Sequence, residues 1–258
     1  MRAHQPLTSW STAVTARRLA PIAPIAALLI ASLVGCNPGV ADSGSDSKPS
    51  ASASHSGKVS AALGAPAGGS GLSLAEAIVK IPAGTEDRTG YERDSFRLWV
   101  DADKDGCDTR KEVLIAEAVK APEQGARCAL TGGEWLSYYD EVTVNAATKL
   151  DIDHVVPLAE AWDSGASKWD ADRREQYAND LDAERSLVAV TANTNRSKAD
   201  RDPAEWLPPA ASAQCTYGAD WVGTKLRWKL TADDKERAAL EKLAQGCSDT
   251  VVKYEVIA

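Results

Sequence analysis

The composition of the chain changes near residue 71, and this change limits which part of it can fold. Residues 37–71 are rich in Ser, Ala, Gly and Pro and hold almost no large apolar side chains. Such a segment cannot bury enough surface to fold, so we expect a flexible tether over residues 36–71. Residues 72–258 are enough for one compact domain with its own core. Seven of the eight tryptophans fall in this part and are expected to anchor the core.

The first 35 residues predict a lipoprotein signal peptide. A short basic region precedes an apolar stretch, Leu19 to Leu33, which two prolines interrupt. This stretch is too short and too broken to span a bilayer comfortably as a permanent helix. It ends in Leu33-Val34-Gly35-Cys36, a sequence typical of a lipobox. We therefore expect a lipid on Cys36 and display on the extracellular face of the cell membrane, with ordinary secretion as the alternative.

The remaining four cysteines predict two disulfides. An exported protein with an even number of cysteines in its folded part usually pairs them. Three pairings are possible for Cys107, Cys128, Cys215 and Cys247, and we favour Cys107–Cys128 and Cys215–Cys247, because each is the nearest in sequence. Zinc is the rival interpretation, but no Cys-x-x-Cys spacing occurs.

The charge of the chain argues against broad electrostatic capture of nucleic acid. The net charge is −8. Residues 1–35 carry three arginines and no acid, so the rest holds 26 basic and 37 acidic side chains, a net charge of −11. A basic face is the usual sign of nucleic-acid binding. Chemistry on nucleic acid would therefore need a local basic patch and a metal ion.

Hydrophobic periodicity predicts an α+β fold, a mainly helical single domain with a small β element. Ser73 followed by Glu76 forms a capping box that opens a helix over 73–80. Further helices are expected within 89–99, 111–119, 157–162, 170–181, from 193, and within 203–206, 215–229 and 232–245. Strands are expected within 133–144, 149–157 and 186–190.

One histidine is available for chemistry in the folded part. His154 is the only histidine after residue 71, so proton transfer by an imidazole there depends on it. Asp153 precedes it, and Asn195 follows on a later helix. Carboxylate and amide oxygens suit Mg²⁺ or a similar hard cation, which would leave His154 free to accept a proton. The alternative is a structural histidine that is hydrogen-bonded in the core.

A longer pattern resembles the HNH nucleases, also called ββα-metal or His-Me finger nucleases. It consists of Asp151-x-Asp153-His154-Val-Val-Pro157 and Asn193-x-Asn195-Arg196-Ser197-Lys198-x-Asp200. It is most similar to the secreted HNH proteins of the DUF1524 group, which are related to the C-terminal domain of GmrSD-type restriction enzymes. Upstream, Gly90-Tyr91-x-Arg93-Asp94-x-Phe96 adds to the likeness, as does the run from Asp202 to Pro208 downstream. The resemblance covers roughly residues 88–210.

The resemblance implies a metal-dependent endonuclease with a small ββα-metal element. His154 would act as the general base, and Asp153 and Asn195 would hold one Mg²⁺ or Mn²⁺. Lys198 and Arg196 would contact phosphate or stabilise developing charge, with Arg110 at the edge of the site. The expected substrate is nucleic acid, with DNA favoured over RNA, and the expected state is a monomer.

One position departs from the HNH pattern. Many HNH domains carry a middle asparagine that orients the histidine, and nine residues before Asn195 this chain has Ser186. The imidazole of His154 would then be oriented by Ser186, Asp151 or a backbone carbonyl. If none of them does so, the domain is a weakened or inactive copy.

An acidic loop matches a calcium-binding template. Asp101, Asp103, Asp105, Gly106 and Glu112 fit positions one, three, five, six and twelve of that template. Position eight, however, is an aspartate where a hydrophobic residue is usual. The alternative is an ordinary acidic turn. A calcium site would favour a second class of function, a non-catalytic surface lipoprotein that binds a partner, and a cell-wall structural lipoprotein is a third.

Overall fold

The computed structural model describes residues 71–257. The predicted signal peptide, the lipidation site Cys36 and the tether up to residue 70 lie outside the described residues. The described part contains seven α-helices: α1 (Leu74–Lys80), α2 (Thr109–Ala116), α3 (Leu158–Asp163), α4 (Ala171–Ala178), α5 (Ala192–Lys198), α6 (Gln214–Trp228) and α7 (Asp234–Ala244). None of the helices between residues 71 and 257 has the length and apolarity needed to cross a membrane.

The strands are short and pair only two at a time. They are β1 (Leu72–Ser73), β2 (Glu123–Gln124), β3 (Leu130–Thr131), β4 (Trp135–Ser137), β5 (Val142–Val144), β6 (Leu150–His154), β7 (Leu187–Thr191) and β8 (Val251–Val252). Four antiparallel pairs result: β1–β8, β2–β3, β4–β5 and β6–β7. Single turns of 3₁₀-helix join several of these elements: η1 (Arg93–Ser95), η2 (Ala126–Cys128), η3 (Ala147–Lys149), η4 (Ala166–Lys168) and η5 (Ala211–Ala213). Mixed helices and small sheets agree with the expected α+β class.

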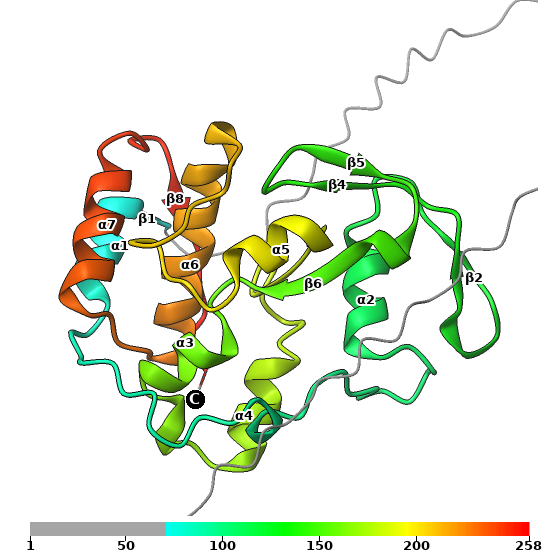
Figure 1. Ribbon diagram of the computed structural model, residues 1–258, viewed down its shortest axis with the longest axis horizontal. Coiled ribbons are helices and arrows are strands. Elements are labelled where there is room, and N and C mark those ends of the chain that lie inside the picture. The colour runs from blue at the N-terminus through cyan, green and yellow to red at the C-terminus, as the bar shows by residue number, and fades with distance from the viewer. Residues whose placement is uncertain (1–70, 258) are drawn as a thin grey trace, which may run out of the picture. The chain divides into compact units, whose positions relative to one another are not determined.

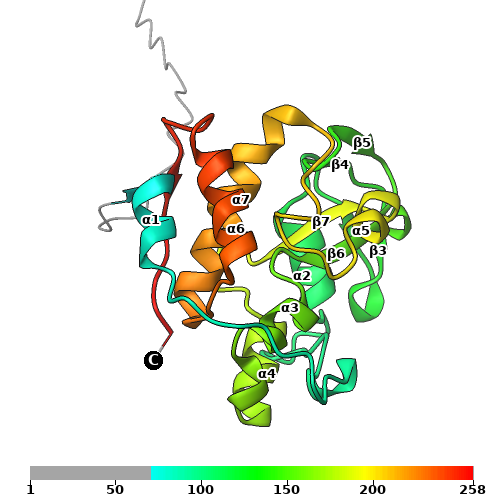
Figure 2. The same ribbon diagram turned by 60° about the vertical axis from the view of Figure 1, so that its left-hand side comes forward.

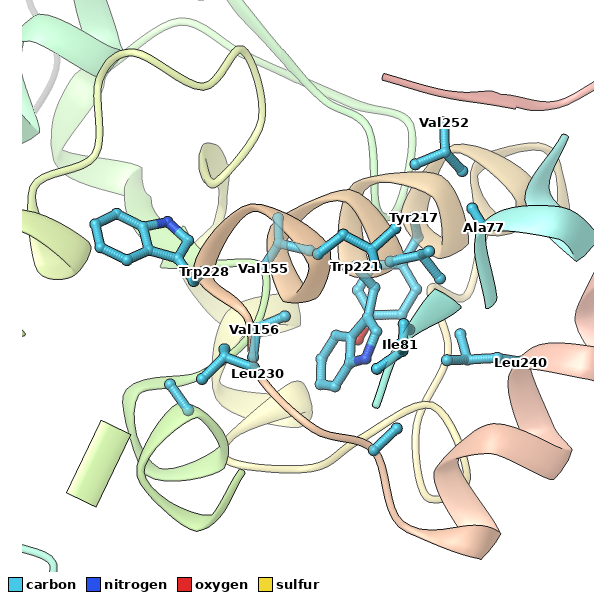
Figure 3. Close-up of a cluster of buried hydrophobic side chains, with 14 of the residues drawn as sticks. Ala77, Ile81, Val155, Val156, Tyr217, Trp221, Trp228, Leu230, Leu240 and Val252 are labelled. Atoms are coloured by element: carbon cyan, nitrogen blue, oxygen red, sulfur yellow. The ribbon is translucent and has the colours of Figure 1, made fainter. Parts of the chain in front are cut away.

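The larger core forms around α6. Helices α1 and α7 pack against α6, and β8 lies beside it (Figures 1 and 2). Tyr217 and Trp221 of α6 are fully buried, and Figure 3 shows them among side chains from α1, α7 and β8. Val155 and Val156 follow β6 directly and belong to the same cluster. The chain immediately after the His154 motif is therefore held in the core.

A second, smaller core lies under β6 and β7. Ile152 and Leu187 pack there against Val113 and Leu114 of α2, together with Trp135 of β4. Successive side chains of a strand point to opposite faces, so Asp151 and Asp153 face away from α2. On that other face, α5 contacts both strands (Figure 1). Strand β6 is thus apolar toward α2 and carries its two aspartates toward α5, beside Val188 and Val190 of β7.

Helices α3, α6 and α7 are also joined by a buried ion cluster. Lys225 is fully buried, and its ammonium group lies 2.6 Å from a carboxylate oxygen of Glu160 and 2.8 Å from one of Glu236. Burial raises the pKa of Glu160 to about 8, although the charge of Lys225 opposes this shift. Removing Lys225 alone would leave two buried acids without a counter-charge, which is strongly destabilising.

Both predicted disulfides are present. Cys107 is bonded to Cys128, and Cys215 is bonded to Cys247. The first pair connects the loop before α2 with η2. The second connects the start of α6 with the chain after α7. Nearest-neighbour pairing in sequence was therefore the correct choice among the three possibilities.

Most predicted elements are observed, and two predictions were wrong. The capping box is formed, with Ser73 and Glu76 each accepting a hydrogen bond from the backbone NH of the other. The helix expected within 89–99 is only the 3₁₀ turn η1, although Phe96 is buried as expected. Residues 203–206 form a turn instead of a helix, because Asp202 binds the next backbone NH groups and two prolines follow at 208 and 209.

Candidate active site

The candidate site lies where the polar face of β6 meets α5. Residues of β6 and β7 pair in antiparallel register, with His154 opposite Leu187. Thr191 accepts a hydrogen bond from the backbone NH of Thr194 and so caps α5 immediately after β7. This short connection brings Asn195 and Lys198 over β6. His154 is the last residue of β6, so the backbone can direct its side chain and that of Asp153 toward one site.

A cavity of about 340 Å³ is found at this position. Three residues predicted for the active site line it, namely Asp153, His154 and Asn195. Arg196 lines it as well. Residues more than forty positions apart in the sequence thus line one cavity.

His154 is buried, and one of its ring nitrogens is engaged. Its Nε2 atom lies 3.0 Å from the carbonyl oxygen of Ala178. A carbonyl can only accept, so in the neutral ring Nε2 carries the proton and Nδ1 has the free lone pair. Burial lowers the pKa of His154 to about 4, opposed by the hydrogen bond to Ala178. The ring is therefore neutral at physiological pH and can accept a proton at Nδ1.

Ser186 does not orient the imidazole directly. Its hydroxyl donates to a carboxylate oxygen of Asp180 at 3.1 Å. The same carboxylate binds Arg227 at 2.8 Å and the indole NH of Trp228 at 2.8 Å. These bonds hold the segment between α4 and β7 against α6, and Ala178 ends α4 just before it. Of the three candidates for orienting His154, the structure shows a backbone carbonyl.

Asp153 is paired inside the protein. The ammonium group of Lys198 lies 2.8 Å from its Oδ2 and 3.0 Å from its Oδ1. The phenol of Tyr139 also donates to Oδ2, at 2.7 Å. Burial raises the pKa of Asp153 and lowers that of Lys198, while their mutual attraction opposes both shifts. Lys198 additionally donates to the carbonyl of His154 at 2.9 Å, which connects the end of α5 to the end of β6.

The oxygen atoms at this site are of the types that bind a hard divalent cation. The amide nitrogen of Asn195 donates to Asp151 at 3.3 Å, so carboxylates of β6 and the amide of α5 are neighbours. Two carboxylates and an amide oxygen are the ligand types that Mg²⁺ and Mn²⁺ prefer. Asp153 forms an ion pair with Lys198. A cation held by Asp153 and Asn195 would therefore compete with that ammonium group for the carboxylate.

The other predicted substrate-binding residues take different positions. Arg196 is exposed and lines the cavity. Arg110 donates to the backbone carbonyl of Leu150 at 2.7 Å, at the beginning of β6, and it does not line the cavity. Its predicted contact with substrate stays a prediction. Lys198 is fully buried on Asp153, so contact with phosphate would require it to leave that carboxylate.

The predicted calcium loop brings its first three acids together. Carboxylate oxygens of Asp101, Asp103 and Asp105 lie within 4.8 Å of one another. The backbone NH of Gly106 donates to Asp101 at 3.1 Å, and the other carboxylate oxygen of Asp101 is buried without a hydrogen-bond partner within residues 71–257. Glu112 lies within the same distance of Asp105. Calcium binding by this loop stays a prediction.

Sequence reasoning missed Tyr139, and it named a backbone carbonyl as a candidate partner of His154 without identifying that of Ala178. Tyr139 is fully buried and holds Asp153 from a strand connection, between β4 and β5, that no motif marks. Every residue has a backbone carbonyl, so the sequence cannot indicate which one binds the histidine. Arg93 was noted only as part of a family motif, although it also lines the cavity. The pair Tyr138-Tyr139 stands in a stretch rich in aromatic residues, and such stretches are too common to indicate that one hydroxyl binds a site residue.

The site combines a neutral buried histidine, an acidic residue beside it and an amide and cationic groups from a helix, an arrangement suited to hydrolysis of phosphate esters. The comparison with known families concerns the chain as a whole. Residues 111–243 match the family described as GmrSD restriction endonucleases, C-terminal domain, and the chain belongs to this family.

The chain also resembles a fungal protein along most of its folded part. The chain is 39% identical over 182 residues to an uncharacterized secreted protein of Arthroderma benhamiae (strain ATCC MYA-4681 / CBS 112371). The match covers 70% of this chain and 87% of that protein. No solved structure matches the chain.

Proposed function

We propose that this protein is a metal-dependent endonuclease of the HNH type that hydrolyses phosphodiester bonds of nucleic acid outside the cell. The observation that carries the proposal is the meeting of His154, Asp153 and Asn195 at one cavity, through the arrangement β6–β7–α5. Membership of the GmrSD family supports a nuclease, and the printed name of the relative supports an extracellular location. DNA is the proposed substrate.

His154 is proposed as the general base. The carbonyl of Ala178 holds Nε2–H, so Nδ1 is the atom that accepts the proton of the attacking water. The pKa of about 4 keeps this atom unprotonated at neutral pH, although it also makes His154 a weak base. Activation of the water would then depend on positioning and on the neighbouring charges as much as on basicity.

Asp153 and Asn195 are proposed to hold one Mg²⁺ or Mn²⁺. Bound there, the cation would supply positive charge to the scissile phosphate and to the leaving 3′ oxygen. Arg196 is exposed and lines the cavity, so its guanidinium group is proposed to bind phosphate oxygens. Lys198 neutralises Asp153 and positions the backbone of His154. The lipid anchor on Cys36 is part of the proposal and would keep the enzyme at the membrane surface.

The test is nicking of supercoiled plasmid DNA by protein purified from residue 37 onward. We expect nicking with Mg²⁺ or Mn²⁺, no nicking with EDTA, and at least a hundredfold loss in His154→Ala. A protein purified in parallel with the exposed substitution Glu241→Gln is the matched control and should retain wild-type activity. Equal nicking by wild type and His154→Ala, or no nicking by the wild type with any divalent ion, would reject the proposal. Structured and single-stranded RNA, tested in parallel, decides between nucleic acids.

The alternative is a non-catalytic surface protein that a calcium ion stiffens. The buried, unpartnered oxygen of Asp101 beside two further aspartates favours this possibility. Calorimetry with Ca²⁺, Mg²⁺ and Mn²⁺ separates the two functions. Metal binding lost in Asp153→Ala but kept in Asp103→Asn supports the nuclease. The reverse pattern, in a protein that does not nick DNA, supports the calcium-binding module.

A further inference from the structure

Arg93 reaches the candidate active site from a distant part of the chain. It begins η1, about sixty residues before the His154 motif, and it lines the same cavity as His154, Asn195 and Arg196. Arg93 and Arg196 thus enter one cavity from different elements, η1 and α5.

The charge of Arg93 is not neutralised by an acidic partner. Nearby arginines are paired: Arg88 lies 2.7 Å from Asp163, and Arg97 lies 3.2 Å from Glu175. Within residues 71–257, no carboxylate oxygen lies within 4.0 Å of the Arg93 guanidinium group. The guanidinium group of Arg93 is exposed, so its charge is accessible to a ligand in the cavity.

The exposed guanidinium group of Arg93 therefore brings a positive charge to this cavity, in a chain whose net charge is −8. The planar guanidinium fork matches two phosphate oxygens at once, so an exposed arginine beside a buried base is suited to hold a phosphate. Arg196 also has no carboxylate partner among the described ion pairs. The cavity is lined by these two arginines and by Asp153 and Asp200, and the two exposed guanidinium groups are the positive charges that an acidic protein could offer to a phosphate here.

We propose that Arg93 is a substrate-binding residue that, together with Arg196, holds a backbone phosphate of nucleic acid at the cavity of His154. This inference rests on the proposed function and names a phosphate ligand for the same site. Arg93 would position the phosphodiester and add to its affinity, and it would not take part in proton transfer. Its contribution is therefore expected in substrate binding, before the chemical step.

The experiment compares Arg93→Gln with Arg97→Gln. Arg97 is the matched control, because it is an exposed arginine four residues away that is paired with Glu175 and does not line the cavity. Binding of a fluorescein-labelled DNA oligonucleotide is followed by anisotropy in EDTA, over a series of salt concentrations. Both side chains are exposed, so we expect both variants to fold, which urea unfolding would verify.

We expect Arg93→Gln to weaken binding about five- to tenfold and to reduce the slope of log K against log salt by about one. Arg97→Gln should stay within about twofold of the wild type. In nicking assays Arg93→Gln should raise KM with little change in kcat, and Arg93→Lys should recover part of the affinity, because it keeps the charge but loses the fork.

The outcomes separate this inference from the proposed function. Equal affinities and salt slopes for the two glutamine variants would overturn the role of Arg93, even if the wild type nicks DNA. Weaker binding by Arg93→Gln alone would support it, even if no divalent ion produces nicking and the nuclease proposal fails. No measurable binding of the oligonucleotide by the wild type would overturn the inference outright.

Discussion

The ammonium group of Lys198 lies 2.8 Å from Oδ2 of Asp153, and both side chains are buried. This contact joins the end of α5 to β6, and it places a positive charge on the carboxylate that is proposed to hold the metal ion. Two charges at this distance inside a protein stabilise each other, but each is costly without its partner. Asp153 therefore depends on Lys198 for its ionised state whenever no other cation is bound.

Substituting Lys198 should destabilise the fold strongly. In Lys198→Ala the carboxylate of Asp153 remains buried with only Tyr139 as a donor, so we expect a loss of about 3 to 5 kcal/mol in the free energy of unfolding. Urea denaturation measures this loss. Lys235→Ala, on the exposed side of α7, is the control and should change the free energy by less than about 0.5 kcal/mol. A loss below about 1 kcal/mol in Lys198→Ala would show that the buried pair contributes little.

Substituting Ser186 should leave catalysis nearly intact. The imidazole of His154 is held by the carbonyl of Ala178, whereas Ser186 donates to Asp180. We expect Ser186→Ala to lose about 1 kcal/mol of stability through the missing hydrogen bond and to nick DNA within about threefold of the wild type. His154→Ala, assayed in parallel, shows how far nicking activity falls when the proposed base is removed. A hundredfold drop in Ser186→Ala at unchanged stability would show that the hydroxyl orients the histidine after all.

Stability should fall with rising pH through the titration of Glu117. Burial raises the pKa of this carboxyl to about 7, opposed by a hydrogen bond from the backbone NH of Ala189. The folded protein thus holds the proton more tightly than the unfolded chain, whose glutamate titrates near 4.5. This contribution is complete below pH 4.5, and it is lost as the pH rises through 7.

The measurement compares the wild type with Glu117→Gln in urea at pH 5, 6, 7 and 8. Between pH 5 and 8 we expect the wild type to lose about 2.5 kcal/mol more than the variant, because a shift of one pKa unit corresponds to about 1.4 kcal/mol and this range covers most of the titration. Glu241→Gln, which changes an exposed carboxyl on α7, should retain the wild-type slope. Parallel pH curves for the wild type and Glu117→Gln would contradict the raised pKa.

Removing the Cys215–Cys247 bond should destabilise the α6–α7 region. The bond closes a loop of 32 residues, and the loss of such a constraint on the unfolded chain is worth about 3 to 4 kcal/mol. We expect this decrease in the unfolding free energy of Cys215→Ala/Cys247→Ala. The wild type in reducing buffer should behave similarly, apart from any additional effect of reducing Cys107–Cys128. An unfolding curve that matches the oxidised wild type would contradict the prediction.

Local sequence signals predicted the elements of the site well. The capping box at Ser73 and the strand expected within 149–157 depend on neighbouring residues, and both are observed. The prediction within 203–206 was wrong for a local reason as well, since Asp202 and two prolines favour a turn. The η1 region departs for a tertiary reason. Its aromatic residues Tyr91 and Phe96 pack on Trp162 and the main core without needing a continuous helix.

The partners of the site residues were decided by packing. The sequence contains Lys198 three residues after Asn195, which predicts a basic group near the site but not its complete burial on Asp153. Likewise, the substitution of serine for the usual asparagine at 186 left the orientation of His154 open. The answer lies in a carbonyl at the end of α4, a group that every residue carries.

The sequence predicted the main helices, the strands that carry the site, and His154 as the one histidine after residue 71, and it favoured the disulfide pairing that the structure shows. These features depend on composition and on residues that are close in the chain. The tertiary structure alone decided that Tyr139 and Lys198 hold Asp153, that Ala178 holds His154, and that Arg93 enters the same cavity as Arg196. Such contacts join distant segments, and they follow from which surfaces are buried together, a property of the whole packed chain.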